Sequence, residues 1–467
     1  MTVRIPFDNS YATLPEVFFT RLPPTPVSAP VTLAWNAALA AELGISGTDP
    51  NVFAGNTVPD GAAPLAQLYA GHQFGNYNPQ LGDGRAVLLG EVIDNNGLRR
   101  DIQLKGSGPT PYSRMGDGRA WLGPVLREYV VSEAMHALGV PTTRALAAMA
   151  TGDPVYREQG GLPGAVLTRI AASHLRVGTF QVFAHRGHID ELRTLTDYAI
   201  ARHHPQADGP IGLLAAVCAA QAELVAAWMS VGFIHGVMNT DNCTISGETI
   251  DYGPCAFMDA YDEARVFSSI DQMGRYAYGN QPRIAVWNMA QLATALIQLF
   301  DDKEAAVEQA TAIVHAMPGQ LQAAWLRRFG AKVGLEDAKA TDQPLIEDLL
   351  ALMQKDGADF TNAFAALGQP GARDQFTDRA AFDEWEALWQ SRVGHEATQI
   401  MAHANPQIIP RNHPIEAMIE AAVAGDMEPF DRLMKAFAQP YDVAPEYDDL
   451  RRPPTAQEIV PATFCGT

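Results

Sequence analysis

The sequence predicts an α+β fold in two lobes, a small lobe that contains β-strands and a large, mostly α-helical lobe. Short apolar segments joined by turn residues lie in the first part of the chain. From Asp197 onward, apolar residues recur at the spacing of amphipathic helices. We therefore expect a first domain over residues 1–170 and a second over residues 171–467, with a hinge within 165–200.

Two strands are predicted in the small lobe, Arg85–Ile93 and Arg100–Lys105. The residues between them, Asp94-Asn95-Asn96-Gly97, are typical of a tight hairpin turn. Residues 1–60 are proline-rich and irregular, with one short helical stretch near Leu33–Leu43. A helix is expected over Pro124–Leu138, because proline suits a first helical turn and apolar residues then line one face.

The large lobe is expected to be built from helices. Its most apolar stretch, Ile211–Ile234, is long enough to suggest a membrane span, but Gln221 and Glu223 at its middle favour a buried core helix. The helices expected in this lobe are Ile211–Ser230, Trp287–Phe300, Ala305–Ala316, Leu321–Phe329, Leu345–Met353, Arg379–Val393 and Pro414–Ala424.

Composition limits the classes of function. The 467 residues are 47% hydrophobic and 18% charged, which is enough apolar material for a large core. The net charge of −20 repels nucleic acid and anionic membranes, so we expect neither as a partner. The N-terminus lacks a signal-peptide pattern, and the four cysteines show no disulfide framework or zinc spacing, which favours a cytoplasmic protein.

A glycine-rich turn and a lysine follow the order found in the small lobe of protein kinases. Gly82-Asp83-Gly84-Arg85 opens the first strand, and Lys105 ends the second. Glycines let backbone amides approach phosphates, although this motif taken alone is better explained as a plain turn. In kinases the lysine grips phosphates and a glutamate on the next helix holds it. Glu128 and Glu133 are both candidates, and we favour Glu128.

A second cluster extends this comparison. His235 and Asn242 have the spacing of the kinase catalytic loop, and Asp251-Tyr252-Gly253 follows nine residues later. Asn242 and Asp251 supply the hard oxygen ligands that a magnesium–phosphate complex needs. Val237 occupies the position of the kinase catalytic aspartate, and Asp241 is the only carboxylate within the loop. Asp241 is either a base for a differently placed nucleotide or a residue of an Asx-turn. We interpret His235 as a buried structural histidine.

Further basic and glycine-rich positions lie between these clusters. Asp117 and Gly118 belong to a second glycine-rich loop, and Arg169 and Arg176 follow. Seven residues separate the two arginines, which corresponds to two helical turns or to staggered positions along a loop. In so acidic a chain they form a plausible triphosphate clamp, with surface salt bridges as the alternative.

With these residues described, the chain resembles the selenoprotein O (SelO) family of protein adenylyltransferases, called YdiU in bacteria. The resemblance covers about residues 70–300 and the last few residues. The similar stretches include LGDGRAVLLGE, QLKGSGPTPYSRMGDGRAWLGPVLRE, VLTRIAASHLRVGTF, GFIHGVMNTDN, DYGPCAFMD, GRYAYGNQPRIAVWNMAQLATAL and TFCGT.

The resemblance implies a protein-kinase-like fold that binds ATP inverted and transfers AMP to Ser, Thr or Tyr hydroxyls of proteins. It implies Mg²⁺ or Mn²⁺ as cofactor, held by Asn242 and Asp251, and Asp241 as proton acceptor. Glu128 would pair with Lys105. The residues implied to hold the nucleotide are Gly82, Gly84, Arg85, Lys105, Asp117, Gly118, Arg169 and Arg176.

One departure concerns redox chemistry. Family members carry a cysteine or selenocysteine near the C-terminus, and Cys465 corresponds to it as cysteine. Some members pair this residue with a cysteine in the activation segment, where this chain has none and Cys255 lies earlier. The alternatives to adenylyl transfer are a small-molecule or protein kinase, which the valine at Val237 disfavours, and a nucleotide-sensing pseudokinase scaffold.

Overall fold

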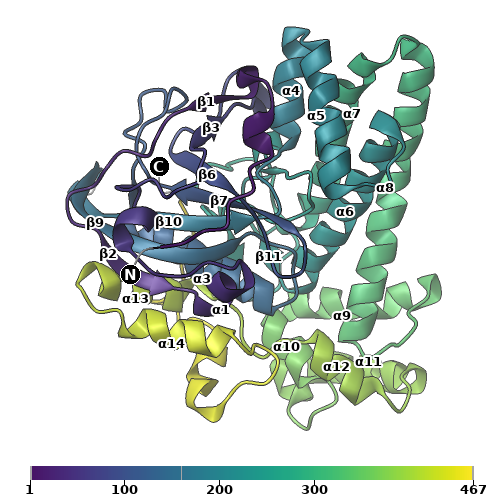
Figure 1. The fold of residues 1–467 in the computed structure, drawn as a ribbon. Coiled ribbons are helices and arrows are strands. Elements are labelled where there is room, and N and C mark those ends of the chain that lie inside the picture. Colours follow the sequence, from purple (N-terminus) through teal and green to yellow (C-terminus); the bar gives the residue numbers. More distant parts are fainter. Residues whose placement is uncertain (1–2, 159, 465–467) are drawn as a thin grey trace.

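The computed structural model describes residues 3–158 and 160–464, and it confirms an α+β fold. Its main sheet is antiparallel, with strand order β1-β3-β6-β7-β10-β9-β2 and β8 paired to β10. Helices α4 to α8 stand beside the sheet, and helices α9 to α12 lie beyond them (Figure 1). The strands are β1 Phe19–Arg21, β2 Val31–Trp35, β3 Leu65–Gln67, β4 Gly71–Gln73, β5 Asn76–Asn78, β6 Ala86–Ile93, β7 Arg99–Lys105, β8 Ala120–Trp121, β9 Arg144–Arg157, β10 Gly160–Ala171, β11 Phe233–Ile234 and β12 Ala256–Phe257.

Most of the described α-helices follow the sheet strands in the chain. The last strand of the main sheet along the chain is β10, and α4 begins six residues after its end. The α-helices are α1 Ala37–Glu42, α2 Pro50–Phe53, α3 Leu122–Ala137, α4 Val177–Arg186, α5 Ile189–His203, α6 Gly209–Ser230, α7 Gln281–Leu296, α8 Lys303–Lys332, α9 Gln343–Asp356, α10 Phe360–Ala366, α11 Arg379–Arg392, α12 Ala397–Ala404, α13 Asn412–Val423 and α14 Glu428–Phe437.

The β6–β7 hairpin forms as the sequence predicts. Asp94 Oδ1 accepts hydrogen bonds from the backbone amides of Asn96 and Leu98, both at 2.9 Å. Gly97 takes the positive φ of 78° that such a turn requires. The two strands pair from Ile93 with Arg99 to Ala86 with Lys105, with a register shift near Gly90.

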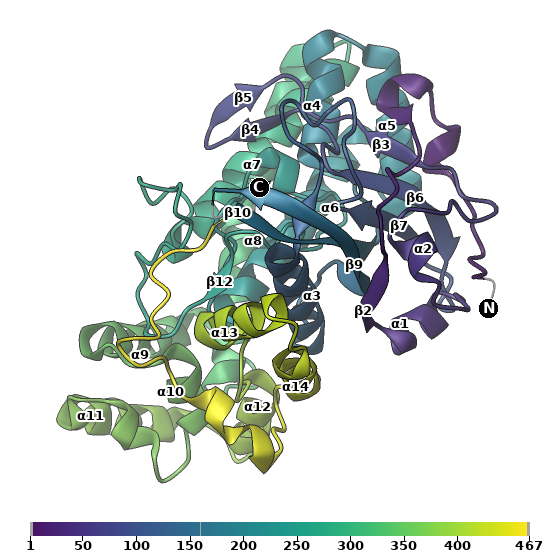
Figure 2. The same ribbon diagram turned by 90° about the vertical axis from the view of Figure 1, so that its left-hand side faces the viewer.

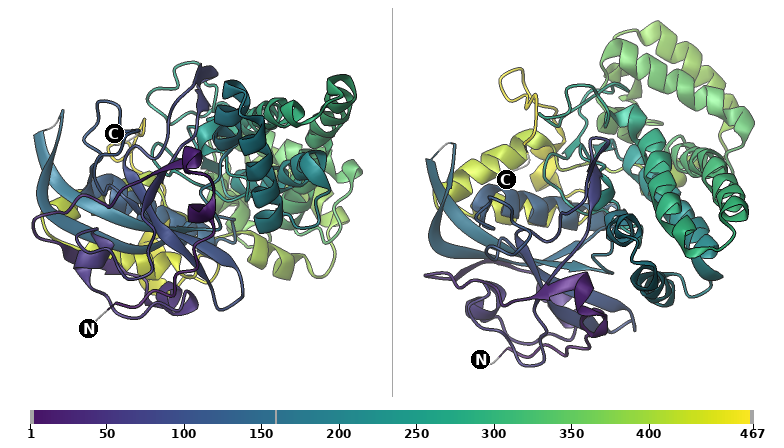
Figure 3. Two further views of the ribbon diagram at one scale, coloured as in Figure 1. Left: turned by 45° about the horizontal axis from the view of Figure 1, so that its top comes forward. Right: turned by 90° about the horizontal axis from the view of Figure 1, so that it is seen from above.

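The period of two along β7 separates its side chains into two environments. Ile102 and Leu104 join the core that packs against α1 and α2. The alternate residues, Asp101, Gln103 and Lys105, point to the opposite side, where α3 lies. The sheet is thus sandwiched between the N-terminal elements and α3 (Figure 3).

Two predictions about secondary structure are wrong in detail, and one long hairpin was not predicted. Leu33–Leu43 is not one helix: a strand runs to Trp35 and α1 follows. The helices expected at 305–316 and 321–329 are a single helix, α8, which continues through Pro318. Residues 144–171 hold the long β9–β10 hairpin, which the sequence analysis did not identify.

Helix α6 is the apolar segment that suggested a membrane span. By length and composition it could cross a membrane, and it is the one described helix that could. Its residues pack mainly inside the protein: 61% of its most apolar window is buried, and α7 and α8 lie against it. It therefore serves as a core helix, as predicted.

The C-terminal part of the chain returns to the small lobe. Helices α13 and α14 lie against α3, on the side away from the sheet (Figures 1 and 2). Tyr129 of α3 packs edge-on against Phe430 of α14, with ring centroids 5.5 Å apart. Arg127 of α3 reaches Glu416 of α13 at 2.9 Å. Helix α3, and with it Glu128, is therefore held from both sides.

Candidate active site

A lysine, a glutamate and an aspartate meet where β7 and α3 face the helical part of the chain. Lys105 ends β7, and its Nζ donates to the carboxylate of Glu128 in the second turn of α3. Asp251 approaches from the loop after β11, with Oδ1 3.3 Å from the same Nζ. Glu133, the other candidate, binds Arg144 at 2.8 Å instead. The predicted pairing of Lys105 with Glu128 is confirmed.

Asp251, a predicted metal ligand, contacts both Lys105 and the other predicted ligand, Asn242. Its φ of 67° is rare for a residue with a Cβ, and such outliers concentrate at functional sites. Its Oδ2 accepts a hydrogen bond from Asn242 Nδ2 at 3.1 Å. Burial alone would raise the pKa of Asp251, but the charges of Lys105 and Arg85 hold that pKa well below its ordinary value. Asp251 is therefore an anion at neutral pH.

Asp241 lies one residue before Asn242, in a short 3-10 turn that spans Thr240–Asn242. Its side chain is buried, and Oδ2 accepts a hydrogen bond from Gln73 Nε2 at 3.2 Å. Oδ1 is also buried and has no hydrogen-bond partner. Burial raises the pKa of Asp241 to about 6. A carboxylate with one free oxygen and this pKa is ionised at pH 7 and able to accept a proton.

The hairpin β4–β5 covers this turn. Gly71 approaches so closely that a Cβ there would lie 2.5 Å from Asp241 Oδ1. The His72 amide donates to Thr240 Oγ1 at 2.7 Å, and the Phe74 amide donates to Asn239 Oδ1 at 3.0 Å. The sequence analysis missed this hairpin, although two glycines flanking three large residues mark it as a tight turn.

The burial and hydrogen bonds of His235 and Val237 indicate structural roles. His235 is 1% exposed, its Nε2 donates to Ile250 O at 2.9 Å, and its Nδ1 accepts from the Val237 amide. Val237 is buried as well, and its carbonyl accepts from Asn242 Nδ2. The interpretation of His235 as a structural histidine is confirmed.

Arg169 lies on β10, directly opposite Gln103 of β7. It is 4% exposed, and its Nη1 lies 3.2 Å from Glu128 Oε1. Its Nε donates to His174 Nε2 at 3.2 Å. Arg169 and Lys105 therefore share one glutamate, and the protein itself supplies partners for the arginine.

Arg176 occupies a different position, directly before the first residue of α4. Its Nη1 donates to a backbone carbonyl and lies 3.7 Å from Asp83 Oδ1, and its guanidinium stacks 4.4 Å above the Tyr69 ring. Its Nε is buried without a hydrogen-bond partner. The two predicted arginines thus lie on a strand and at a helix start, not on successive turns of one helix.

The two glycine-rich loops pack against each other. A Cβ at Gly82, where φ is 138°, would lie 2.4 Å from the Tyr112 ring, and a Cβ at Gly84 would lie 2.8 Å from the Tyr112 carbonyl oxygen. Gly118 packs against Gly108 of its own loop. Asp117 is exposed and binds Arg157 in a bidentate pair at 2.8 and 3.2 Å. Gly82 and Gly84 are thus required by contacts between the loops, and Gly118 by a contact within its own loop.

A buried charge network extends behind the site, and the sequence analysis missed its members. His174 Nδ1 lies 2.8 Å from Asp101 Oδ2, and Arg202 of α5 lies 2.5 Å from Asp101 Oδ1. Burial lowers the pKa of His174 to about 4, so the ring is neutral. It donates to Asp101 and accepts from Arg169. The alternation of Asp101, Gln103 and Lys105 with apolar residues was the one sequence signal for this polar face.

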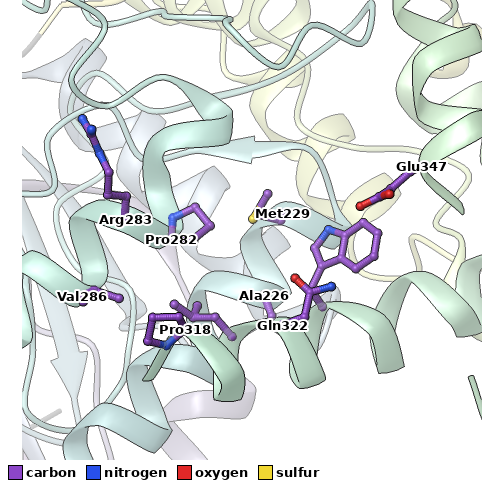
Figure 4. A pocket seen from close by; sticks show the side chains of 10 residues that line it. Ala226, Met229, Pro282, Arg283, Val286, Pro318, Gln322 and Glu347 are labelled. Atoms are coloured by element: carbon purple, nitrogen blue, oxygen red, sulfur yellow. The ribbon is translucent and has the colours of Figure 1, made fainter. Parts of the chain in front are cut away.

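An apolar cavity lies away from this site. It measures about 450 Å³ and is lined by Met229, Val286 and Trp325 among others, between α6, α7 and α8 (Figure 4). None of the predicted site residues lines it. Cys255 is buried, and burial raises its thiol pKa to about 12, so it is not a reactive thiol. Cys465 lies outside the described residues.

Comparisons with known proteins extend the resemblance beyond the quoted stretches. Residues 2–438 match the family model described as protein adenylyltransferase SelO. Similar proteins include the protein nucleotidyltransferases YdiU of Roseobacter denitrificans, 70% identical, and of Ruegeria sp., 67% identical. That of Bradyrhizobium diazoefficiens is 56% identical. All three alignments cover 100% of this chain and of the relative. The chain therefore belongs to the SelO family of protein adenylyltransferases.

Proposed function

We propose that this protein transfers AMP from ATP to serine, threonine or tyrosine hydroxyls of other proteins, in a protein-kinase-like cleft that holds ATP inverted. The observation that supports this most is the position of Asp251, which contacts both Lys105 and Asn242 while Asp241 lies on the adjoining turn. A buried valine, Val237, occupies the position where a kinase needs its aspartate. The only carboxylate in this loop, Asp241, thus lies further along the chain than the catalytic aspartate of a kinase.

The proposed nucleotide site is a group of cations and close-packed loops around Asp251. Arg85 and Lys105 both lower the pKa of Asp251, which means that their charges lie near it. Arg176 has a buried nitrogen without a partner, as expected of a group that awaits an anion. The residues assigned to the nucleotide are Gly82, Gly84, Arg85, Lys105, Asp117, Gly118, Arg169 and Arg176.

The donor set fits a divalent cation that retains few protein ligands. Asn242 and Asp251 are within one hydrogen bond of each other, and Asp251 stays ionised. Among residues 3–158 and 160–464, no cluster of three or more His, Cys, Asp or Glu side chains forms a metal site. Mg²⁺ commonly binds one or two carboxylates together with substrate phosphates. When bound by Asn242 and Asp251, Mg²⁺ or Mn²⁺ would neutralise phosphate charge.

The protein's own residues account for the remaining chemistry. Asp241 accepts the proton of the target hydroxyl while the oxygen of that hydroxyl forms a bond to the α-phosphorus. The bond between the α-phosphorus and the bridging oxygen breaks, and pyrophosphate leaves. Lys105 and Arg176 offset the charge that develops on this leaving group. Glu128 and Arg169 hold Lys105 in place through the shared carboxylate.

The division of the chain follows from this proposal. Residues 1–170 form the nucleotide-binding lobe, and residues 171–467 form the large lobe with the loop and the metal ligands. The return of α13 and α14 to α3 adds a C-terminal brace to the first lobe. A cytoplasmic location agrees with the buried, unpaired thiols of Cys218, Cys243 and Cys255.

A paired labelling experiment tests the reaction class. The protein is incubated with Mg²⁺, a protein mixture and ATP labelled at either the α- or the γ-phosphate. AMP transfer puts α-label on protein side chains and releases γ-label as pyrophosphate. Asp241→Ala should bind ATP yet lose transfer. Transfer of γ-label alone would establish a kinase, and transfer of neither label would favour a pseudokinase scaffold.

A further inference from the structure

Arg275 is a cation held in place without a counter-ion. It lies in the segment between Asp251 and α7, and its guanidinium carbon is 4.7 Å from the centroid of the Trp287 ring and 5.6 Å from that of Tyr276. Its Nε and Nη2 are buried and have no hydrogen-bond partner. Among the described residues, no carboxylate oxygen lies within 4.0 Å of this guanidinium.

Three other arginines around the cleft differ in this respect, because each has a carboxylate nearby. Arg169 lies 3.2 Å from Glu128, Arg202 lies 2.5 Å from Asp101, and Arg176 lies 3.7 Å from Asp83. Buried guanidinium nitrogens without partners are costly, since they have lost water and gained nothing in return. In a chain of net charge −20, an arginine left in this state marks a place for an external anion.

The position of Arg275 connects it to the proposed base. The tip of the β4–β5 hairpin lies beside it, because a Cβ at Gly75 would be 3.7 Å from Arg275 Cζ. The same hairpin holds Asp241 through Gln73. Asn239 Oδ1 completes the connection, because it accepts hydrogen bonds from the Phe74 amide and from the hydroxyl of Tyr276. Figure 2 shows this hairpin projecting beside α4 and α7, the helix that carries Trp287.

The turn before Arg275 is held by hydrogen bonds, and the segment around it presents apolar side chains outward. Asp271 fixes its turn by accepting hydrogen bonds from the backbone amides of Arg275 and Tyr276, at 2.9 and 2.7 Å. Met273 is 91% exposed and Ile270 is 58% exposed. Exposed apolar side chains beside a fixed cation are suited to contact with a polypeptide.

We propose that Arg275 determines substrate specificity by binding a carboxylate side chain, aspartate or glutamate, near the target hydroxyl of the protein substrate. This inference rests on the proposed function, because the polypeptide that it orients is the acceptor of AMP. Stacking on Trp287 fixes the plane of the guanidinium, so that an incoming carboxylate meets a preorganised donor. A neutral residue at the same place would leave the guanidinium unpaired.

Binding of paired peptides tests this without requiring transfer. Fluorescence anisotropy would measure the affinity of labelled serine and tyrosine peptides that carry Glu, Gln or Lys at each flanking position, with ATP present and divalent metal removed. Wild-type protein should prefer Glu over Gln about tenfold at one position. Arg275→Gln should abolish that preference, Arg275→Lys should retain part of it, and Arg275→Glu should prefer the Lys peptide at that position.

Arg265→Gln provides the matched control. Arg265 lies in the same segment but stacks on Phe267, 4.4 Å from the ring centroid, so this variant should keep the wild-type preference. Equal binding of Glu and Gln peptides by wild type, a preference that survives in Arg275→Gln, or no peptide binding at all would overturn the assignment. A carboxylate preference without α-label transfer would refute AMP transfer but leave the Arg275 assignment intact.

Discussion

The cleft and the outer helices α9 to α12 both contain short ion pairs, but their surroundings differ. Around the cleft, the side chains of Lys105, Glu128 and Arg169 are 13%, 5% and 4% exposed, and one carboxylate serves both cations. On the outer helices, Arg373 and Asp383 lie 2.6 Å apart, yet their side chains are 48% and 47% exposed. Water can replace a lost partner at the second site but not at the first.

The difference teaches that distance alone does not locate function. A surface pair typically contributes less than about 1 kcal/mol, because solvent screens it. Removing one member of a buried pair leaves a charge without compensation, which costs about 3–5 kcal/mol. At the cleft, buried charges that share a partner lie close to two carboxylates with shifted pKa values, Asp241 and Asp251, a combination expected of catalytic groups. Each prediction below tests one part of this contrast.

The largest effect is expected from Asp251→Ala. The change removes the ionised side chain that contacts Lys105 and Asn242, so α-label transfer should fall by roughly a thousandfold or more. Asn242→Ala should have a smaller effect, about tenfold, because a neutral amide holds a cation less strongly than a carboxylate. Initial rates at saturating ATP would measure both. Wild-type turnover in Asp251→Ala would refute the assignment of the metal ligand.

The second prediction concerns Glu128→Gln, which replaces the carboxylate shared by Lys105 and Arg169 with a neutral amide. Arg169 then loses its carboxylate partner and Lys105 retains only Asp251, and we expect the free energy of unfolding to fall by about 3 kcal/mol and ATP to bind about tenfold more weakly. Denaturant unfolding and calorimetry would measure the two effects.

Glu133→Gln is the matched control for this change. Glu133 lies on the same helix and also binds an arginine, Arg144, at 2.8 Å, but it does not contact Lys105. It should lose stability with no change in ATP affinity. Equal losses of ATP affinity in both variants would show that α3 acts only through its general stability.

A third prediction concerns Lys332, a buried basic residue outside the cleft. Lys332 of α8 is 2% exposed and has no carboxylate partner among the described residues, and its ammonium lies 4.4 Å from the Phe364 ring centroid. Burial lowers its pKa to about 7. From pH 7 to about 10 the unfolded chain thus binds a proton that the folded chain lacks, so this group makes stability rise with pH.

Lys332→Met removes that contribution. The melting temperature of the variant should exceed that of wild type at pH 7, and the difference should shrink as the pH approaches 10. Paired thermal scans across this range would measure it. Lys435→Met, at an exposed position on α14, should show a constant difference. A difference that does not change with pH in Lys332→Met would contradict the argument.

Local sequence patterns correctly predicted those elements whose structure is determined by residues close together in the chain. The turn at 94–97, the helix that holds Glu128 and the loop from His235 to Asn242 each have chemistry that their own residues specify. The pairing of Lys105 with Glu128 followed from the order of these parts, and α6 was identified as a core helix because polar residues interrupt it.

The remaining features depend on contacts between distant residues. The stretches 145–149 of β9 and 164–171 of β10 are buried throughout, and β9 is rich in alanine, so they lack the alternation that marks a half-exposed strand. Asp101, His174 and Arg202 come from a strand, a loop and a helix, and no local spacing indicates that they meet. The sequence predicts two helices, one on each side of Pro318, whereas tertiary packing carries α8 through this residue.

The smallest effect is expected at the surface pair of the outer helices. Arg373→Gln breaks the contact with Asp383, and solvent replaces it, so the free energy of unfolding should not change measurably. A double-mutant cycle with Asp383→Asn, measured by denaturant unfolding at low and high salt, isolates the pair, and its coupling should fall further as salt is added. The same cycle applied to Glu128→Gln and Arg169→Gln should give a coupling several times larger that responds little to salt. Similar couplings at the two sites would mean that burial does not set the strength of these pairs, and the contrast between the cleft and the outer helices would fail.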